Sequence, residues 1–384
     1  MQFDVITIDP AVTRRNEQIE KIANTVIRGY DRAKTLLRLN GRKAPYDDLN
    51  YEFVGGPSDK LRMRHYDKSL RLLWKAEEHV EWSSFRDLTK NEKQLRDLAE
   101  DSLNASEKQH VKRMRSEEFT QMLDSEYSRE QKQAIVNILS LIGHGEAYAW
   151  MVSTEVLNDV QSTGARAAVT MQVLEEAKHF VVLRELIQAF DCPIPRMNAW
   201  EYLLLERTFK AKGLEKFFGM NVIVESFALS LFGMMGTMPG LEVLRLFHLD
   251  ESRHTALPKN YFEEFPMSWW QTHRPSAQAY RLSLVLPAIP ILGLVERDLG
   301  LLGIDVFEFG GSMARKILFL ADRAGFKVGV PREGLEVFLD WVFNLYCQHT
   351  RPNHVQRNFI ASETTTGVNE LAIEAEVFGL AASA

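Results

Sequence analysis

Two short motifs in the middle of the chain combine a glutamate with a histidine three positions later. The first is Glu176-Ala-Lys-His179, and the second is Glu251-Ser-Arg-His254. Residues three apart lie on one face of an α-helix, so each motif would present a carboxylate and an imidazole side by side. Carboxylates with some imidazole suit iron or manganese better than a metal that prefers thiolates. The motifs therefore predict a metal site between two helices.

Two further glutamates stand alone in apolar segments. Glu146 is the one formally charged residue in 133–154, and Glu225 is the one in 217–241. A lone carboxylate in a buried helix is unfavourable unless it is protonated, paired or bound to a metal. Four carboxylates and two imidazoles suit two divalent ions, with one Glu from each of two helices and a Glu-x-x-His from each of the other two. The six candidate ligands are Glu146, Glu176, His179, Glu225, Glu251 and His254.

The acids that precede the two motif glutamates are candidates for supporting the histidines. A metal-bound histidine normally donates its other ring N–H to a carboxylate or a carbonyl. We expect Asp250 to fill this role for His179, and Glu175 to do the same for His254. Lys178 and Arg253 are expected to neutralise these acids. The alternative for both acids is ion pairing at the surface.

Other histidines need a separate interpretation. Glu107 and His110 have the same spacing as the two motifs, but they lie in a charge-rich segment and are predicted to be on a solvated helix face. His144 and His248 lie close in sequence to candidate ligands. They could be extra ligands, but we expect them to be core histidines or to support the ligands.

The elements that carry all these residues are predicted to be helices. Apolar residues recur at helical spacing in most of the chain, and no long alternation with a period of two occurs, so the fold class is all-α. Four central segments are apolar on nearly every face, as in helices at the centre of a bundle. These four segments are 130–160, 164–190, 213–238 and 241–257. Further helical patterns occupy 12–39, 91–123, 276–300, 311–325 and 333–350.

We expect one helical domain over 1–384, built around the segments that carry the candidate ligands. Its predicted parts are an N-terminal helical extension (1–129), a di-metal four-helix core (130–258), C-terminal helices (259–360) and a tail (361–384).

Composition limits the function classes. The 384 residues include 46 basic and 52 acidic side chains, for a net charge of −6, which argues against a nucleic-acid-binding surface. The two cysteines, Cys192 and Cys347, exclude a disulfide scaffold, a cysteine-rich zinc module and an in-chain iron–sulfur centre. No signal-peptide pattern begins the chain, and the most membrane-like run, 282–295, is short and contains two prolines. We therefore expect a soluble, cytoplasmic protein without a membrane span.

The candidate ligands and their order resemble those of the ferritin-like, ribonucleotide-reductase-small-subunit-like di-iron carboxylate proteins. This group includes acyl carrier protein desaturases, multicomponent monooxygenases and arylamine N-oxygenases. The segment Asp250-Glu-Ser-Arg-His254 resembles their Asp-Glu-x-Arg-His signature, and the resemblance covers 130–258. It implies a ferritin-like four-helix bundle that holds two iron ions, or one manganese and one iron, and activates dioxygen.

The resemblance implies an oxygenase or oxidase that hydroxylates, N-oxidises or desaturates a small apolar organic substrate. Electrons would come from a separate ferredoxin- or flavin-type reductase, and we expect a homodimer. One alternative is a ferroxidase or another metal-handling protein. Another is a radical-generating subunit, against which stands Leu183 at the usual position of the radical tyrosine. A third is a purely structural protein in which the motifs form buried ion pairs with Lys178 and Arg253.

Overall fold

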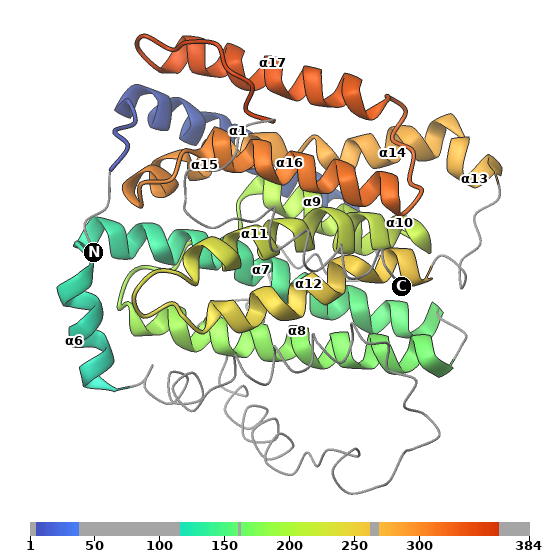
Figure 1. The fold of residues 1–384 in the computed structure, drawn as a ribbon, viewed down its shortest axis with the longest axis horizontal. Coiled ribbons are helices and arrows are strands. Elements are labelled where there is room, and N and C mark those ends of the chain that lie inside the picture. The colour runs from blue at the N-terminus through green and yellow to red at the C-terminus, as the bar shows by residue number, and fades with distance from the viewer. Residues whose placement is uncertain (1–4, 38–115, 160–162, 262–268, 361–384) are drawn as a thin grey trace, which may run out of the picture.

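The computed structural model describes residues 5–37, 116–159, 163–261 and 269–360 (Figure 1). Within these ranges every regular element is a helix, which confirms the predicted all-α class.

Four helices form the centre of the molecule. Helix α7 (Arg129–Asp159) and the following helix α8 (Thr163–Ala189) pack along each other. Helix α12 (Leu244–Tyr261) packs on α8, and α11 (Glu225–Met235) packs on both α12 and α7. The four helices therefore contact one another in a closed cycle, close to the four apolar segments that the sequence predicts.

The third central segment is not one uniform helix. It consists of α10 (Leu214–Phe217), the π-helix η4 (Phe218–Val224) and then α11. At the end of η4, the Glu225 N–H donates to the carbonyl of Met220, five residues back, instead of four. The sequence analysis treats 213–238 as a single helix and does not predict this wider turn.

Helix α9 (Ala199–Lys210) is a helix that the sequence analysis does not predict. Its first turn is closed by a capping box: the Asn198 side chain accepts from the Glu201 N–H, and the Glu201 carboxylate accepts from the Asn198 N–H. The helix packs on α7 and on η4.

A second layer of helices covers α7 and α11 on one side (Figure 1). The predicted segment 276–300 is divided in two at Pro287, which has no N–H to continue a helix. Helix α15 packs on α7, α16 packs on α11 and α15, and α17 packs on α16 as the uppermost element of Figure 1. The remaining helices are α1 (Pro10–Leu36), α6 (Glu117–Glu126), α13 (Trp269–His273), α14 (Pro275–Val285), α15 (Ala288–Leu301), α16 (Val306–Arg323) and α17 (Arg332–Thr350).

One helical stretch in the described part of the chain, Leu214–Met235, is long and apolar enough to cross a membrane. Other parts of the protein bury 94% of its most apolar window, as they would bury the core helix of a globular protein. The sequence analysis instead singles out 282–295, which the break at Pro287 divides between two helices.

Candidate metal centre

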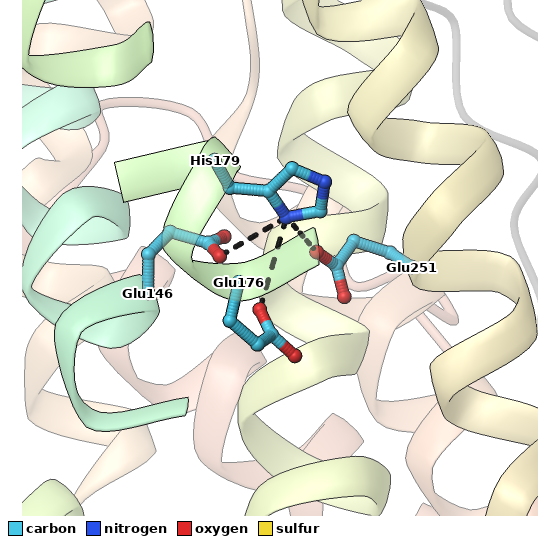
Figure 2. Close-up of side chains that lie close together, drawn as sticks. All are labelled: Glu146, Glu176, His179 and Glu251. Atoms are coloured by element: carbon cyan, nitrogen blue, oxygen red, sulfur yellow. Dashed lines mark hydrogen bonds and ion pairs between the residues drawn. The ribbon is translucent and has the colours of Figure 1, made fainter. Parts of the chain in front are cut away.

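The four central helices bring all six predicted ligands into one buried cluster. None of the six side chains is more than 2% exposed. They form two sets, in each of which one potential ligand atom per residue lies within 4.8 Å of the others. The His179 set is Glu146, Glu176, His179 and Glu251, and it is drawn in Figure 2. The His254 set is Glu176, Glu225, Glu251 and His254.

His179 turns one ring nitrogen toward the carboxylates of its set (Figure 2). Its Nδ1 lies 2.9 Å from Glu251 Oε1, 3.3 Å from Glu146 Oε2 and 3.7 Å from Glu176 Oε2. Its other nitrogen, Nε2, lies 3.0 Å from Asp250 Oδ2, on the opposite helix α12. The structure thus places Asp250 where the sequence analysis expects the supporting acid.

His254 on α12 has the same arrangement, with the roles of α8 and α12 exchanged. Its Nδ1 lies 3.0 Å from Glu251 Oε2, 3.1 Å from Glu176 Oε1 and 4.0 Å from Glu225 Oε2. Its Nε2 lies 2.9 Å from Glu175 Oε2, on α8. Each imidazole therefore faces the cluster with one nitrogen and an acid of the opposite helix with the other, which fixes its orientation.

The other residues that the sequence analysis considers lie around the cluster. Lys178 Nζ is 2.9 Å from Asp250 Oδ2, so Asp250 contacts both a histidine and a lysine. His144 Nδ1 is 2.9 Å from Glu201 Oε1, and His248 Nδ1 donates to a backbone carbonyl at 2.8 Å. Neither histidine belongs to the two sets. The side chain of Arg253, and both Glu107 and His110, lie outside the described residues.

The pKa values of the four carboxylates shift in opposite directions, which divides the carboxylates into two pairs. Burial, with repulsion from Glu251 or Glu176, raises the pKa of Glu146 and of Glu225 well above the usual range. Burial would also raise the pKa of Glu176 and Glu251, but the charge of His254 and hydrogen bonds from neighbouring side chains outweigh it and lower the pKa of both. The carboxylates that both sets share are thus the ones held ionised.

The two imidazoles compensate this charge in the metal-free protein. Burial lowers the pKa of a histidine, but the surrounding acids outweigh it and raise the pKa of both His179 and His254 well above the usual range. The largest raising effect is the hydrogen bond to Asp250 for His179 and the charge of Glu176 for His254. Protons on these rings occupy the space where a dication would bind, since a ligating imidazole is neutral.

Among the described residues, two buried oxygen atoms of the shared carboxylates have no hydrogen-bond partner in good geometry. They are Glu176 Oε2 and Glu251 Oε1, the latter close to His179 Nδ1 but outside hydrogen-bonding direction. A buried carboxylate oxygen without a partner is unfavourable, and a cation beside it would remove that penalty. Every atom that could bind a metal here is a carboxylate oxygen or an imidazole nitrogen. The six residues therefore fit two divalent ions such as iron or manganese.

Comparisons with protein-family models, curated proteins and solved structures found no match to this chain. The described geometry alone supports the functional argument below.

An apolar cavity lies beside Glu146 and Glu225, the two carboxylates that each belong to only one set. It offers about 50 Å³ to a water-sized molecule, and its wall is formed mainly by apolar side chains of α7, α9, α11 and α15. Its acidic lining residues are Glu146, Glu225 and Glu201. A molecule in this cavity would therefore contact the carboxylates of both sets in largely apolar surroundings.

Two side chains near the cluster are not predicted by the sequence analysis. Glu201 on α9 lines the cavity and contacts His144, and its capping-box spacing with Asn198 is a readable signal. Gln172 on α8 donates to Glu176 Oε1 at 3.1 Å. Its position four residues before Glu176, on the same helix face, is the only sequence signal for it.

Proposed function

We propose that the protein is a non-haem di-iron oxygenase or oxidase that uses dioxygen to hydroxylate, N-oxidise or desaturate a small apolar organic substrate. The observation that carries this proposal is the pair of four-residue sets sharing Glu176 and Glu251, with an apolar cavity against Glu146 and Glu225. The oxygen-rich donors favour iron at both positions, with a manganese–iron pair as a variant.

The ligand roles follow from the two sets. Glu176 and Glu251 would be shared by the two ions, while Glu146 and Glu225 would each bind one ion. Bound iron would supply the redox chemistry that dioxygen activation needs. Asp250 would keep the ring of His179 oriented through Nε2, so that Nδ1 remains directed at the cluster. The apolar cavity wall would limit the access of water to the reacting groups.

The proposal extends to the fold and the partners. The closed cycle of α7, α8, α12 and α11, with inward-facing Glu and Glu-x-x-His ligands, supports a ferritin-like four-helix bundle. Electrons would be supplied by a separate ferredoxin- or flavin-type reductase. A homodimer in the cytoplasm completes the proposed setting.

A ferroxidase or another metal-handling role is the second candidate, and the size of the cavity favours it. Ligand pockets for drug-sized molecules measure roughly 300–1,000 Å³. The cavity of about 50 Å³ admits dioxygen or a few waters as it stands. A larger organic substrate requires lining side chains such as Phe227 and Leu231 to move.

Reconstitution with Fe(II) tests the metal centre. We expect about two irons per chain after anaerobic loading, as in di-iron carboxylate bundles, and a transient visible absorption on mixing with dioxygen. Glu225→Ala and His254→Ala should each reduce the iron content toward one ion or none. The matched control is His349→Ala, since His349 is an exposed histidine on α17. Full iron content in both cluster variants would contradict the proposal.

A screen with small apolar compounds separates the two candidate functions. An oxygenase or oxidase consumes reductant and dioxygen and forms an organic product. A ferroxidase instead accumulates Fe(III), and no organic compound changes. The screen is read by mass spectrometry of the compounds together with the oxidation state of the iron.

A further inference from the structure

The two halves of the cluster are alike in their ligands but different at one matched position. Gln172 lies four residues before Glu176 on α8, and Phe247 lies four residues before Glu251 on α12. A residue four positions earlier lies on the same helix face as the glutamate. The sequence thus places an amide against one half of the cluster and an aromatic ring against the other.

Gln172 holds two of the ligand carboxylates. Its side chain is 2% exposed, and its Nε2 donates to Glu176 Oε1 at 3.1 Å and to Glu225 Oε1 at 3.4 Å. The other oxygen of Glu225, Oε2, is the one that faces His254, at 4.0 Å from Nδ1. The amide therefore engages the outer oxygen of Glu225 and leaves the inner oxygen for the cluster.

Phe247 provides no such support on the other side. Its ring stacks on the imidazole of His179, with centroids 4.3 Å apart and planes inclined by 24°. Glu146, the terminal carboxylate of this half, is hydrogen-bonded within the described part of the chain to His179 alone. Among the residues that the structure describes, no amide contacts Glu146 as Gln172 contacts Glu225.

We propose that Gln172 is a positioning residue that makes the two metal positions unequal, so that the His254 set binds its ion more tightly than the His179 set. The proposal rests on the metal centre of the proposed function. A donor to the outer oxygen fixes the orientation of a carboxylate, so less ordering remains when the ion binds. Glu146 receives no equivalent support, and its ion should bind more weakly.

Titration of the full-length wild-type protein with Mn(II) alone tests this inequality. Free Mn(II) is followed by its electron paramagnetic resonance signal. We expect two phases of binding, a tighter and a weaker one. His254→Ala should remove the tighter phase, whereas His179→Ala should leave that phase in place and remove the weaker one.

Substitution of the amide tests the role of Gln172 itself. In Gln172→Met, which keeps an unbranched side chain of similar length, the tighter phase should weaken by about 10- to 100-fold. The weaker phase should weaken much less, because its ion shares Glu176 with the other set but does not contact Glu225. The matched control, Phe247→Met, places the same residue at the mirrored position and should leave the tighter phase unchanged. Circular dichroism establishes that each variant is folded.

Several results would overturn the proposal. These are equal affinities at the two positions of the wild-type chain, an unchanged tighter phase in folded Gln172→Met, or equal weakening of both phases. If Gln172→Met does not fold, the His179 and His254 variants still decide which set binds more tightly. A wild-type chain that binds no Mn(II) and no Fe(II) would overturn the metal centre as well, which distinguishes the two failures.

Discussion

Two carboxylates that are largely withdrawn from solvent, Glu225 and Asp298, have different surroundings. In the cluster, Glu225 is surrounded by other acids and by His254, and the arrangement suits a cation. Asp298 on α15 is instead an isolated acid, and its Oδ2 accepts one hydrogen bond from Asn137 on α7 at 3.1 Å. Burial raises the pKa of Asp298 to about 6 from an ordinary value of 3.8. Grouping with histidines and further acids distinguishes the candidate metal centre from a single carboxylate that is only withdrawn from solvent.

The pH dependence of stability should reveal this isolated acid. Because its folded-state pKa is raised, Asp298 contributes stability that is fully present below pH 3.8 and is lost as the pH rises toward about 6. Asp298→Asn should therefore raise the free energy of unfolding by up to about 3 kcal/mol at pH 8, and by little at pH 4. Urea unfolding at both pH values measures the difference. An equal gain at the two pH values would contradict the raised pKa of Asp298. The iron content of Asp298→Asn should equal that of the wild-type protein.

At the residue level, the gathering of the six candidate ligands could be predicted because their signal is local. The spacing of Glu251 and His254 depends only on helix geometry, and the isolation of Glu146 in an apolar segment is visible in the sequence. The contacts of Gln172 could not be predicted in the same way. They depend on how α11 places Glu225 opposite α8, which is a matter of tertiary packing.

At the level of elements, the π-helix η4 determines where Glu225 lies. Within η4, Gly219 packs so closely on α9 that a Cβ atom there would lie 2.6 Å from Thr208 Oγ1. The contact fixes η4 against α9, and η4 ends at Glu225. A side chain at position 219 would therefore displace the element that carries a ligand.

Gly219→Ala should test this coupling between packing and metal binding. Overpacking of a buried contact typically destabilises by about 1–3 kcal/mol. We expect the free energy of unfolding, measured by chemical denaturation, to fall by this amount. The metal content should also fall, because displacement of η4 would move Glu225. Thr208→Ala removes the closest contact atoms. It should restore the metal content in the double variant and change little alone. Full metal content in Gly219→Ala would show that η4 does not set the ligand position.

Helical periodicity predicts the central elements well but does not predict their irregularities. The segments 130–160 and 164–190 match α7 and α8 closely, since their ends carry clear signals. Within the π-helix, Gly219 packs closely on Thr208, a contact between residues that only the fold brings together. Helix α9 had a readable signal in Asn198 and Glu201, but its short apolar pattern resembles a loop between longer helices.

At the scale of the whole molecule, polar contacts join α1 to two helices from the later part of the described chain. Asn16 on α1 donates to the carbonyl of Gly293 on α15 at 2.9 Å and to the hydroxyl of Tyr346 on α17 at 3.0 Å. Tyr346 in turn donates to Glu296 at 3.0 Å. These contacts join three helices outside the central four, and none of the residues named belongs to the cluster.

Metal binding should stabilise the whole fold, because the ligands come from four helices that only the folded chain brings together. A ligand that binds the folded state alone adds about 2.7 kcal/mol at a free concentration 100 times its dissociation constant. The thermal unfolding midpoint should therefore rise with Fe(II) or Mn(II), and a chelator should reverse the rise. In Glu251→Gln the rise should be largely lost, since both sets share this carboxylate.

Asn16→Ala is the matched control for this effect. It should lower the unfolding free energy by about 1–2 kcal/mol through the lost hydrogen bonds, in the metal-free and the metal-loaded protein alike. The increment caused by metal should stay the same, because distant sites contribute additively. If Asn16→Ala removed the increment as Glu251→Gln does, the metal would be stabilising the outer helices and not the central four. An increment kept in Asn16→Ala and lost in Glu251→Gln would identify the buried cluster as the place where the ion acts on the fold.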